Sequence, residues 1–152
     1  MTATNHALTG ALIGLVVGNT LVALPIALIS HFVCDTIPHF GKDADETWLR
    51  SSLFKRSLAA DAIICVLITV ILFLTHPMHW FLAVLCAFIA TSPDLYWISQ
   101  FKKAVEGKKI TRYTNGFGYF AGVIQWFQKP IGIVIEIAWA TAMGLLIFPF
   151  IR

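Results

Sequence analysis

Long apolar runs separated by short polar segments dominate the pattern of the chain. Residues 57–75 form a run with one charged residue, residues 80–97 return after the tight turn His76-Pro77-Met78-His79, and residues 130–151 form the last run. A membrane-crossing helix needs roughly 20 mostly apolar residues. We therefore predict that these three runs span a membrane, with Pro93 breaking the second near its end.

The first apolar block, residues 7–34, is interrupted at residues 18–20 (Gly-Asn-Thr) and again at Pro25. Glycine and asparagine mark a tight turn, so two short helices at about 6–18 and 21–36 are favoured over one kinked helix. Each is short for a full span, and together they can form a shallow or re-entrant hairpin.

Polar and amphipathic segments connect these runs. Residues 41–56 place Trp48, Leu49, Leu53 and Phe54 on one helical face among charges, which fits a helix in the membrane interface or a solvated loop helix. Residues 102–116 read as a basic loop and residues 117–128 as an aromatic amphipathic segment. The expected fold is an all-α polytopic membrane bundle of five or six apolar helices, with residues 1–152 as one integral membrane domain.

Composition and charge support this class. Apolar residues make up 58% of the chain and charged residues 12%, against roughly 25% charged residues in a soluble domain. No Lys or Arg precedes Lys42, so the basic region of a signal peptide is missing and the first apolar block is expected in the mature protein. The basic residues at 42–56 and 102–112 are expected on the cytoplasmic side, in a bacterial inner membrane, with the 76–79 turn outside.

Several acids lie within or at the ends of apolar helices, on the side of the predicted basic loops. Ionisable groups there are costly and usually face a bundle interior, a partner or a water-filled cavity. The four acids are Asp35, Asp61, Asp94 and Glu136. The other polar residues on that side are His6, His31, His39 and Gln125, whereas His76 and His79 lie at the opposite turn.

The strongest local pattern is the run from His31 through Asp35 to His39. His31 and Asp35 are four residues apart and share one face of a helix. Pro38 disfavours helical geometry at the preceding residue, so the helix should end near residue 36 and leave His39 free to fold back. Imidazole and carboxylate groups bind zinc and similar divalent ions, which favours a metal site; a His–Asp hydrogen-bonded pair at a helix end is the alternative.

The remaining candidates are read with their alternatives. Asp94, in Ser92-Pro93-Asp94, presents an acid near a helix end and fits a simple cap or turn as well as a ligand. Asp61 and Glu136 are flanked by apolar residues and can pair with a cation or with basic side chains near the interface. Gln125 fits an aromatic interfacial belt or can orient a ligand. The basic loop is typical of cytoplasmic membrane loops, so no nucleic-acid partner is expected.

Three motifs can be taken together: Asn5-His6-Ala7-Leu8-Thr9-Gly10, the His31…Asp35…His39 run and Ser92-Pro93-Asp94. They resemble the small membrane-bound metal-dependent hydrolases, a family distantly similar to zinc-dependent phospholipase C and related zinc-dependent nucleases. The resemblance implies a helical bundle, a divalent metal such as zinc and phosphoester hydrolysis. It implies as ligands His6, His31, Asp35, His39 and Asp94. One more histidine is expected just before Ile124-Gln125, where this chain has Phe120-Ala121-Gly122.

These observations predict a membrane-embedded metal-dependent hydrolase that acts on a phosphoester, for which a lipid suits an interfacial site. Asp61 is the expected general base, Glu136 a further metal ligand, and Gln125 a residue that orients a ligand. The alternatives are a non-catalytic membrane protein with a structural or degenerate polar site, and a small transporter. A transporter needs polar groups continuing across the bilayer, and the outer halves of these helices have few.

Overall fold

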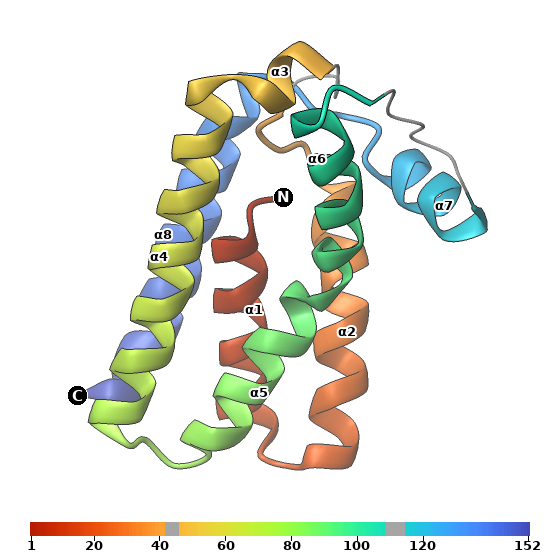
Figure 1. Cartoon of the computed structure of the whole chain (residues 1–152). Helices are drawn as coiled ribbons and strands as arrows, with labels where there is room; N and C mark the ends of the chain where they lie inside the picture. Colours follow the sequence, from red (N-terminus) through yellow and green to blue (C-terminus); the bar gives the residue numbers. More distant parts are fainter. Residues whose placement is uncertain (42–45, 109–114) are drawn as a thin grey trace.

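The computed structural model describes residues 1–41, 46–108 and 115–152 of the chain, and helices dominate it (Figure 1). The predicted all-α class is confirmed for these residues, which add only an isolated bridge between His39 and Gln128. The helices are α1 (Ala3–Val17), α2 (Thr20–Thr36), α3 (Glu46–Arg50), α4 (Ser52–Thr75), α5 (Trp80–Thr91), the 3₁₀ helix η1 (Ser92–Tyr96), α6 (Trp97–Val105), α7 (Gly116–Ile124) and α8 (Gly132–Ile151).

Three helical stretches are long and apolar enough to cross a membrane. They are α4, the continuous stretch Trp80–Val105 and α8, while α1 and α2 are shorter apolar helices. The described part of the chain is therefore an all-helical membrane protein with three candidate spans and two shorter apolar helices, and the predicted number of five or six apolar helices is not confirmed.

The first apolar block forms two helices, as the glycine and asparagine predicted. Gly18 ends α1 with a φ of 65°, a left-handed conformation that glycine adopts without strain. The Asn19 side chain then accepts a hydrogen bond from the N–H of Val22 at the start of α2. A Cβ atom on Gly18 would lie 2.8 Å from Nε2 of His79, so this turn packs directly against the turn between α4 and α5.

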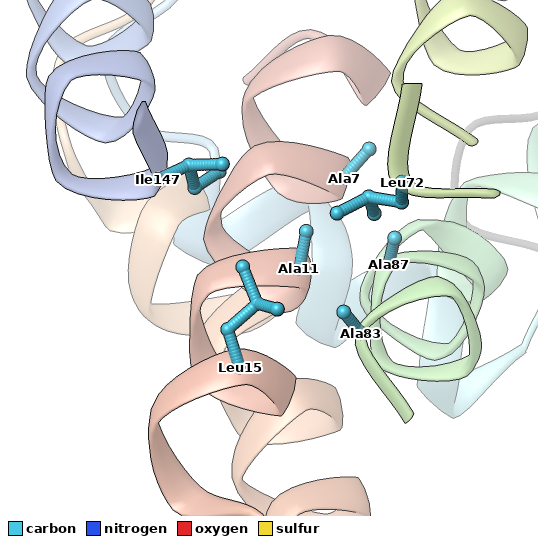
Figure 2. Packing of buried hydrophobic residues seen from close by; sticks show 7 residues of the cluster. All are labelled: Ala7, Ala11, Leu15, Leu72, Ala83, Ala87 and Ile147. Atoms are coloured by element: carbon cyan, nitrogen blue, oxygen red, sulfur yellow. The ribbon is translucent and has the colours of Figure 1, made fainter. Parts of the chain in front are cut away.

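Small residues allow α1 to sit in the middle of the bundle, where it packs against α2, α4, α5 and α8. Figure 2 shows alanines of α1 and α5 facing one another with Leu72 and Ile147 beside them. A Cβ atom on Gly10 would lie 2.4 Å from the carbonyl oxygen of Cys86, and one on Gly14 would lie 2.5 Å from Cα of Ala83. Close backbone approach through small residues is the usual way in which helices associate inside a membrane.

The second predicted span continues further than expected. α5 ends at Thr91, just before Pro93, as predicted, but the chain then forms η1 and continues as α6 to Val105, so Lys102 and Lys103 lie on a helix rather than in a loop. A short 3₁₀ segment tolerates the proline because Pro93 lies at its N-terminus, where a missing N–H leaves no hydrogen bond unmade.

The polar segment before α4 is helical where it is described. α3 covers Glu46–Arg50, and Ser51 accepts a hydrogen bond from the N–H of Phe54 to start α4. Trp48 packs against Phe40 and Phe54, so its ring lies on the bundle. The basic residues Lys42, Lys109 and Arg112 of the predicted cytoplasmic segments lie outside the described residues.

Candidate metal centre

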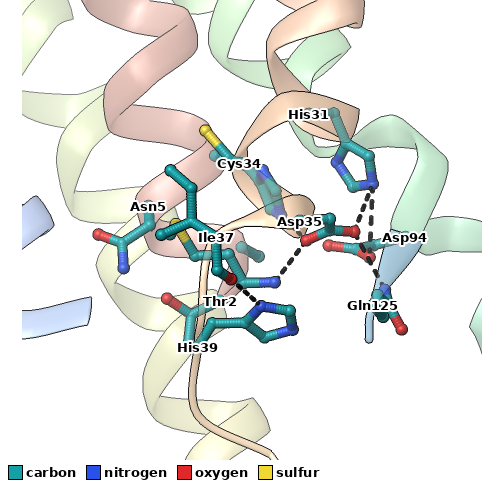
Figure 3. A network of polar contacts seen from close by, with 12 residues as sticks. Thr2, Asn5, His31, Cys34, Asp35, Ile37, His39, Asp94 and Gln125 are labelled. Carbon is teal, nitrogen blue, oxygen red and sulfur yellow. Dashed lines mark hydrogen bonds and ion pairs between the residues drawn. The ribbon is translucent and has the colours of Figure 1, made fainter. Parts of the chain in front are cut away.

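Three separate elements bring histidine and carboxylate side chains together where α1 begins and α2 ends. His6 comes from α1, His31 and Asp35 from the last turns of α2, and Asp94 from η1 (Figure 3). His6, His31 and Asp35 are buried, with exposed fractions of 0%, 3% and 1%. In the described part of the chain, His6, His31 and Asp94 each offer a ligand atom within 4.8 Å of the others.

Asp35 links the two imidazoles. Its Oδ1 lies 3.1 Å from Nε2 of His6, and its Oδ2 lies 3.4 Å from Nε2 of His31. Nε2 of His31 also lies 4.0 Å from Oδ1 of Asp94. The two histidine rings stack with centroids 4.1 Å apart. The four-residue spacing therefore places His31 and Asp35 in contact on one face of α2, as predicted. The packing of the helices brings His6 and Asp94 to the same place.

The outer contacts orient these groups. Nδ1 of His31 donates to the carbonyl oxygen of Ala90 at 2.8 Å, which fixes the ring and leaves Nε2 facing the carboxylates of Asp35 and Asp94. Gln125 donates from Nε2 to Oδ2 of Asp35 at 3.0 Å. Its role in orienting a metal ligand stays a prediction. The backbone nitrogen of Met1 lies 2.5 Å from the other oxygen of Asp35.

His39 lies beside this group but outside the set of mutually close ligand atoms in the described residues. The chain does fold back after Pro38: Nδ1 of His39 lies 2.7 Å from the carbonyl oxygen of Ile37, and Nε2 lies 3.4 Å from Nε2 of Gln128. Burial lowers the pKa of His39, so its ring is neutral near neutral pH and retains a lone pair.

Asp61 and Glu136 each receive hydrogen bonds from the N-terminal segment. Asp61 accepts from the backbone N–H groups of Ala3 and Thr4 at 2.8 and 2.9 Å and from the Thr4 hydroxyl, so a carboxylate from α4 caps α1. Oε2 of Glu136 accepts from the N–H of Thr2 and from the Asn5 amide, both at 3.2 Å. Neither acid joins the described group of close ligand atoms, and their predicted roles as base and ligand stay predictions.

Glu136 also reaches the segment that carries His39. Its Oε1 accepts a hydrogen bond from the N–H of Phe40 at 3.1 Å. The last span is thereby tied both to the start of α1 and to the chain after α2. Glu136, which the sequence suggested as a metal ligand, instead accepts hydrogen bonds from the backbone N–H groups of Thr2 and Phe40.

Sequence reasoning missed two polar residues next to the site. Asn5 is buried and bonds Glu136, while its Oδ1, like Nδ1 of His6, has no hydrogen-bond partner among the described residues. Gln100 is buried on α6, and its Oε1 also lacks a partner there. Asn5 and Gln100 could have been found by the criterion that singled out the acids, because each is a polar side chain within a helix that packs in the bundle.

A cavity of about 330 Å³ adjoins the cluster. Its polar lining includes Asp61, Asp94 and His39 together with three glutamine amides, and its aromatic lining comes from α3, α4, α6 and the segment after α2. The glutamines are Gln100, Gln125 and Gln128, and the aromatic rings are Phe40, Trp48, Phe54, Trp97 and Phe101. A cavity with one polar and one apolar wall suits an amphipathic ligand.

The donor atoms are of kinds that bind divalent ions. Two imidazoles and one carboxylate, from His6, His31 and Asp94, lie mutually close in the described residues, and Asp35 contacts both imidazoles from outside this set. The His31 ring is held through its second nitrogen and Asp35 by the Gln125 amide. Zinc favours nitrogen and oxygen ligands of these kinds, oriented by such outer hydrogen bonds.

Searches of protein-family models, of curated proteins and of solved structures found no match to this chain.

Proposed function

We propose that this chain is a membrane-embedded metal-dependent hydrolase that acts on a phosphoester. The observation that supports this most strongly is the convergence of His6, His31 and Asp94, from three different elements, with ligand atoms within 4.8 Å of one another. Asp35 lies between the two imidazoles, and such a concentration of ionisable groups in an apolar protein is costly unless it serves a function.

In this proposal His6, His31, Asp35 and Asp94 hold the divalent ion, with zinc as the first choice. When bound, a divalent ion lowers the pKa of a water and stabilises negative charge on a phosphoryl oxygen. In the hydrolysis the water oxygen forms the new P–O bond and the P–O bond to the leaving alcohol breaks. One proton of the water passes to the leaving alcohol.

The chain's own residues position the reactants. The Ala90 carbonyl fixes the His31 ring and Gln125 fixes Asp35, so both keep their orientation without a ligand. Asp61 lines the cavity and remains our first choice as the base that accepts a proton. His39 lines the same cavity with a neutral ring, which can contact the substrate or add a metal ligand.

Metal content and hydrolysis test the proposal together. The wild type, His31→Ala and Asp94→Asn are purified in detergent, loaded with zinc, desalted and measured by elemental analysis and by hydrolysis of bis(p-nitrophenyl) phosphate. We expect bound zinc and hydrolysis in the wild type and the loss of both in the two variants. His76→Ala, at the opposite turn, is the control and should behave like the wild type. A wild type that keeps no metal after loading contradicts the proposal.

A specific observation favours the structural alternative. Both oxygens of Asp35 already have protein partners, namely His6 and the Met1 nitrogen on one side and His31 and Gln125 on the other. A closed polar network of this kind can hold helices together without an ion. If the alternative holds, the melting temperature of the wild type is unchanged by zinc and by a chelator.

We propose further that the site lies on the cytoplasmic side of a bacterial inner membrane. The basic residues Lys55 and Arg56 at the start of α4 and Lys102 and Lys103 near the end of α6 lie at the same end of the bundle as the cluster (Figure 1). An impermeant maleimide added to intact cells should label Met78→Cys at the opposite turn and leave Lys108→Cys unlabelled. The reverse labelling pattern contradicts this orientation.

A further inference from the structure

A second hollow, almost wholly apolar, runs along the outer face of the bundle between α4 and α5. It has a volume of about 480 Å³ and is lined by Cys65, Val66, Thr69 and Val70 of α4, by α5 from Phe81 to Thr91 and by Ala7 of α1. None of these residues has a part in the metal site. We call this hollow the α4–α5 groove.

The groove and the polar cavity follow one another along the bundle. Each of three elements lines both, and the lining residues are one helical turn apart: Ala3 and Ala7 on α1, Asp61 and Cys65 on α4, and Thr91 and Asp94 where α5 passes into η1. Residues three or four apart share a helix face, so the carboxylates of Asp61 and Asp94 lie one turn from the groove. Among His6, His31, Asp35 and Asp94, it is Asp94 that lines the cavity.

The length of the groove suits an acyl chain. From Thr91 down to Phe81 the α5 wall covers ten residues, which is roughly 15 Å at 1.5 Å per residue. That is about half of a hydrocarbon core of roughly 30 Å. On α4 the distance from Asp61 to Val70 is similar. On both helices the groove runs from beside Asp61 and Asp94 towards the 76–79 turn, so an acyl chain can follow it over this length.

The cavity end also contains an unused polar group. Oε1 of Gln100 is buried and lacks a hydrogen-bond partner in the described residues, although its side chain lines the cavity. A buried acceptor without a donor is costly, and a ligand hydroxyl would satisfy it. The polar cavity therefore offers Gln100 and Asp94 to a polar group of a ligand, and the α4–α5 groove offers an apolar surface to its chain.

We infer that the α4–α5 groove binds one acyl chain of a membrane lipid whose phosphoester lies in the polar cavity beside Asp94. This inference rests on the proposed function and specifies its substrate class, a lipid phosphoester that enters sideways from the membrane with its acyl chain directed towards the 76–79 turn. The occupant is a lipid of the surrounding membrane rather than a water-soluble ester.

The experiment blocks the groove and varies the chain of the substrate. Val66→Trp fills the groove, and Ile63→Trp is the matched control, because Val66 and Ile63 lie on the same helix with exposed fractions of 61% and 60% and only Val66 lines the groove. Zinc-loaded proteins in phosphatidylcholine nanodiscs are assayed with methyl and dodecyl p-nitrophenyl phosphate diesters. We expect Val66→Trp to lose about tenfold or more in kcat/KM for the dodecyl ester and to keep its rate with the methyl ester, while Ile63→Trp matches the wild type with both.

Equal rates of Val66→Trp and wild type with the dodecyl ester would overturn the inference and leave the hydrolase intact. If the wild type cleaves neither ester, the proposed function fails, and a binding readout decides on the groove. Phosphatidic acid with a diazirine at the end of one acyl chain is photolysed in phosphatidylcholine nanodiscs, and labelled peptides are identified by mass spectrometry. Labelling concentrated on residues 65–70 and reduced only in Val66→Trp supports the groove; labelling spread evenly over lipid-facing residues overturns it.

Discussion

Gly132 of α8 lies against the backbone of His39 so closely that a Cβ atom on Gly132 would be 2.2 Å from the carbonyl oxygen of His39. The two segments are also joined by hydrogen bonds from the N–H of His39 to the carbonyl of Phe127 and from the N–H of Lys129 to the carbonyl of His39. The last span is therefore docked onto the segment that carries a candidate site residue, and the obstacle to a side chain there is backbone, which cannot turn aside.

Gly132→Ala should therefore displace the 37–41 segment from α8 and destabilise the protein by about 1–3 kcal/mol, the range for forcing a side chain into a packed site. Gly144→Ala is the control on the same helix, because a Cβ atom there meets nothing within 4 Å. It should be neutral or stabilise by up to about 1 kcal/mol through helix propensity. Thermal unfolding in detergent measures both; equal melting temperatures would contradict the close approach.

Asp61 should stabilise the start of α1 whether or not it acts as the base. Asp61→Ala removes the acceptor for the N–H groups of Ala3 and Thr4 and should cost about 0.5–2 kcal/mol, whereas Asp61→Asn keeps an oxygen for them and should cost less. If Asp61 is also the base, both variants lose hydrolysis although Asp61→Asn stays folded. Melting curves and the rate with bis(p-nitrophenyl) phosphate separate the two roles; an Asp61→Asn enzyme with full activity would remove Asp61 as the base.

Gln125 should affect metal affinity without touching the ion. Its amide holds Oδ2 of Asp35, and loss of such an orienting hydrogen bond typically weakens metal binding by about 10- to 100-fold. Gln125→Ala should show this decrease in a competition titration with a zinc chelator. Val123→Ala, an exposed residue of α7, should leave the affinity unchanged. Equal affinities of Gln125→Ala and wild type would show that Asp35 needs no such support.

Asp35 should be the most sensitive carboxylate of the cluster. Asp35→Asn keeps the size of the side chain but places an amide where both His6 and His31 face an oxygen. We expect loss of zinc binding, measured by elemental analysis, together with a lower melting temperature, because a partner of two buried imidazoles is lost. Glu106→Gln, on the exposed end after α6, is the control. Retained zinc in Asp35→Asn would exclude Asp35 as a ligand.

The sequence by itself determined the local features. Apolar runs of the right length predicted the helices, Gly18 and Asn19 predicted the turn between α1 and α2, and the four-residue spacing placed His31 and Asp35 on one face. These predictions succeed because they depend on helical periodicity and turn chemistry, which are properties of neighbouring residues. The burial cost of acids in apolar helices also marked the end of the bundle where His6, His31 and Asp94 come together.

Only the tertiary structure decided which polar groups meet. His6, His31 and Asp94 are far apart along the chain and come together because small residues let α1 pack closely against α5. In the same packing Asp61 and Glu136 accept hydrogen bonds from the backbone of residues 2–4 and 40, and Pro93 lies at the start of a 3₁₀ helix that continues the span. A buried carboxylate takes whichever donors the fold brings within reach, and sequence spacing carries no information about donors on other helices.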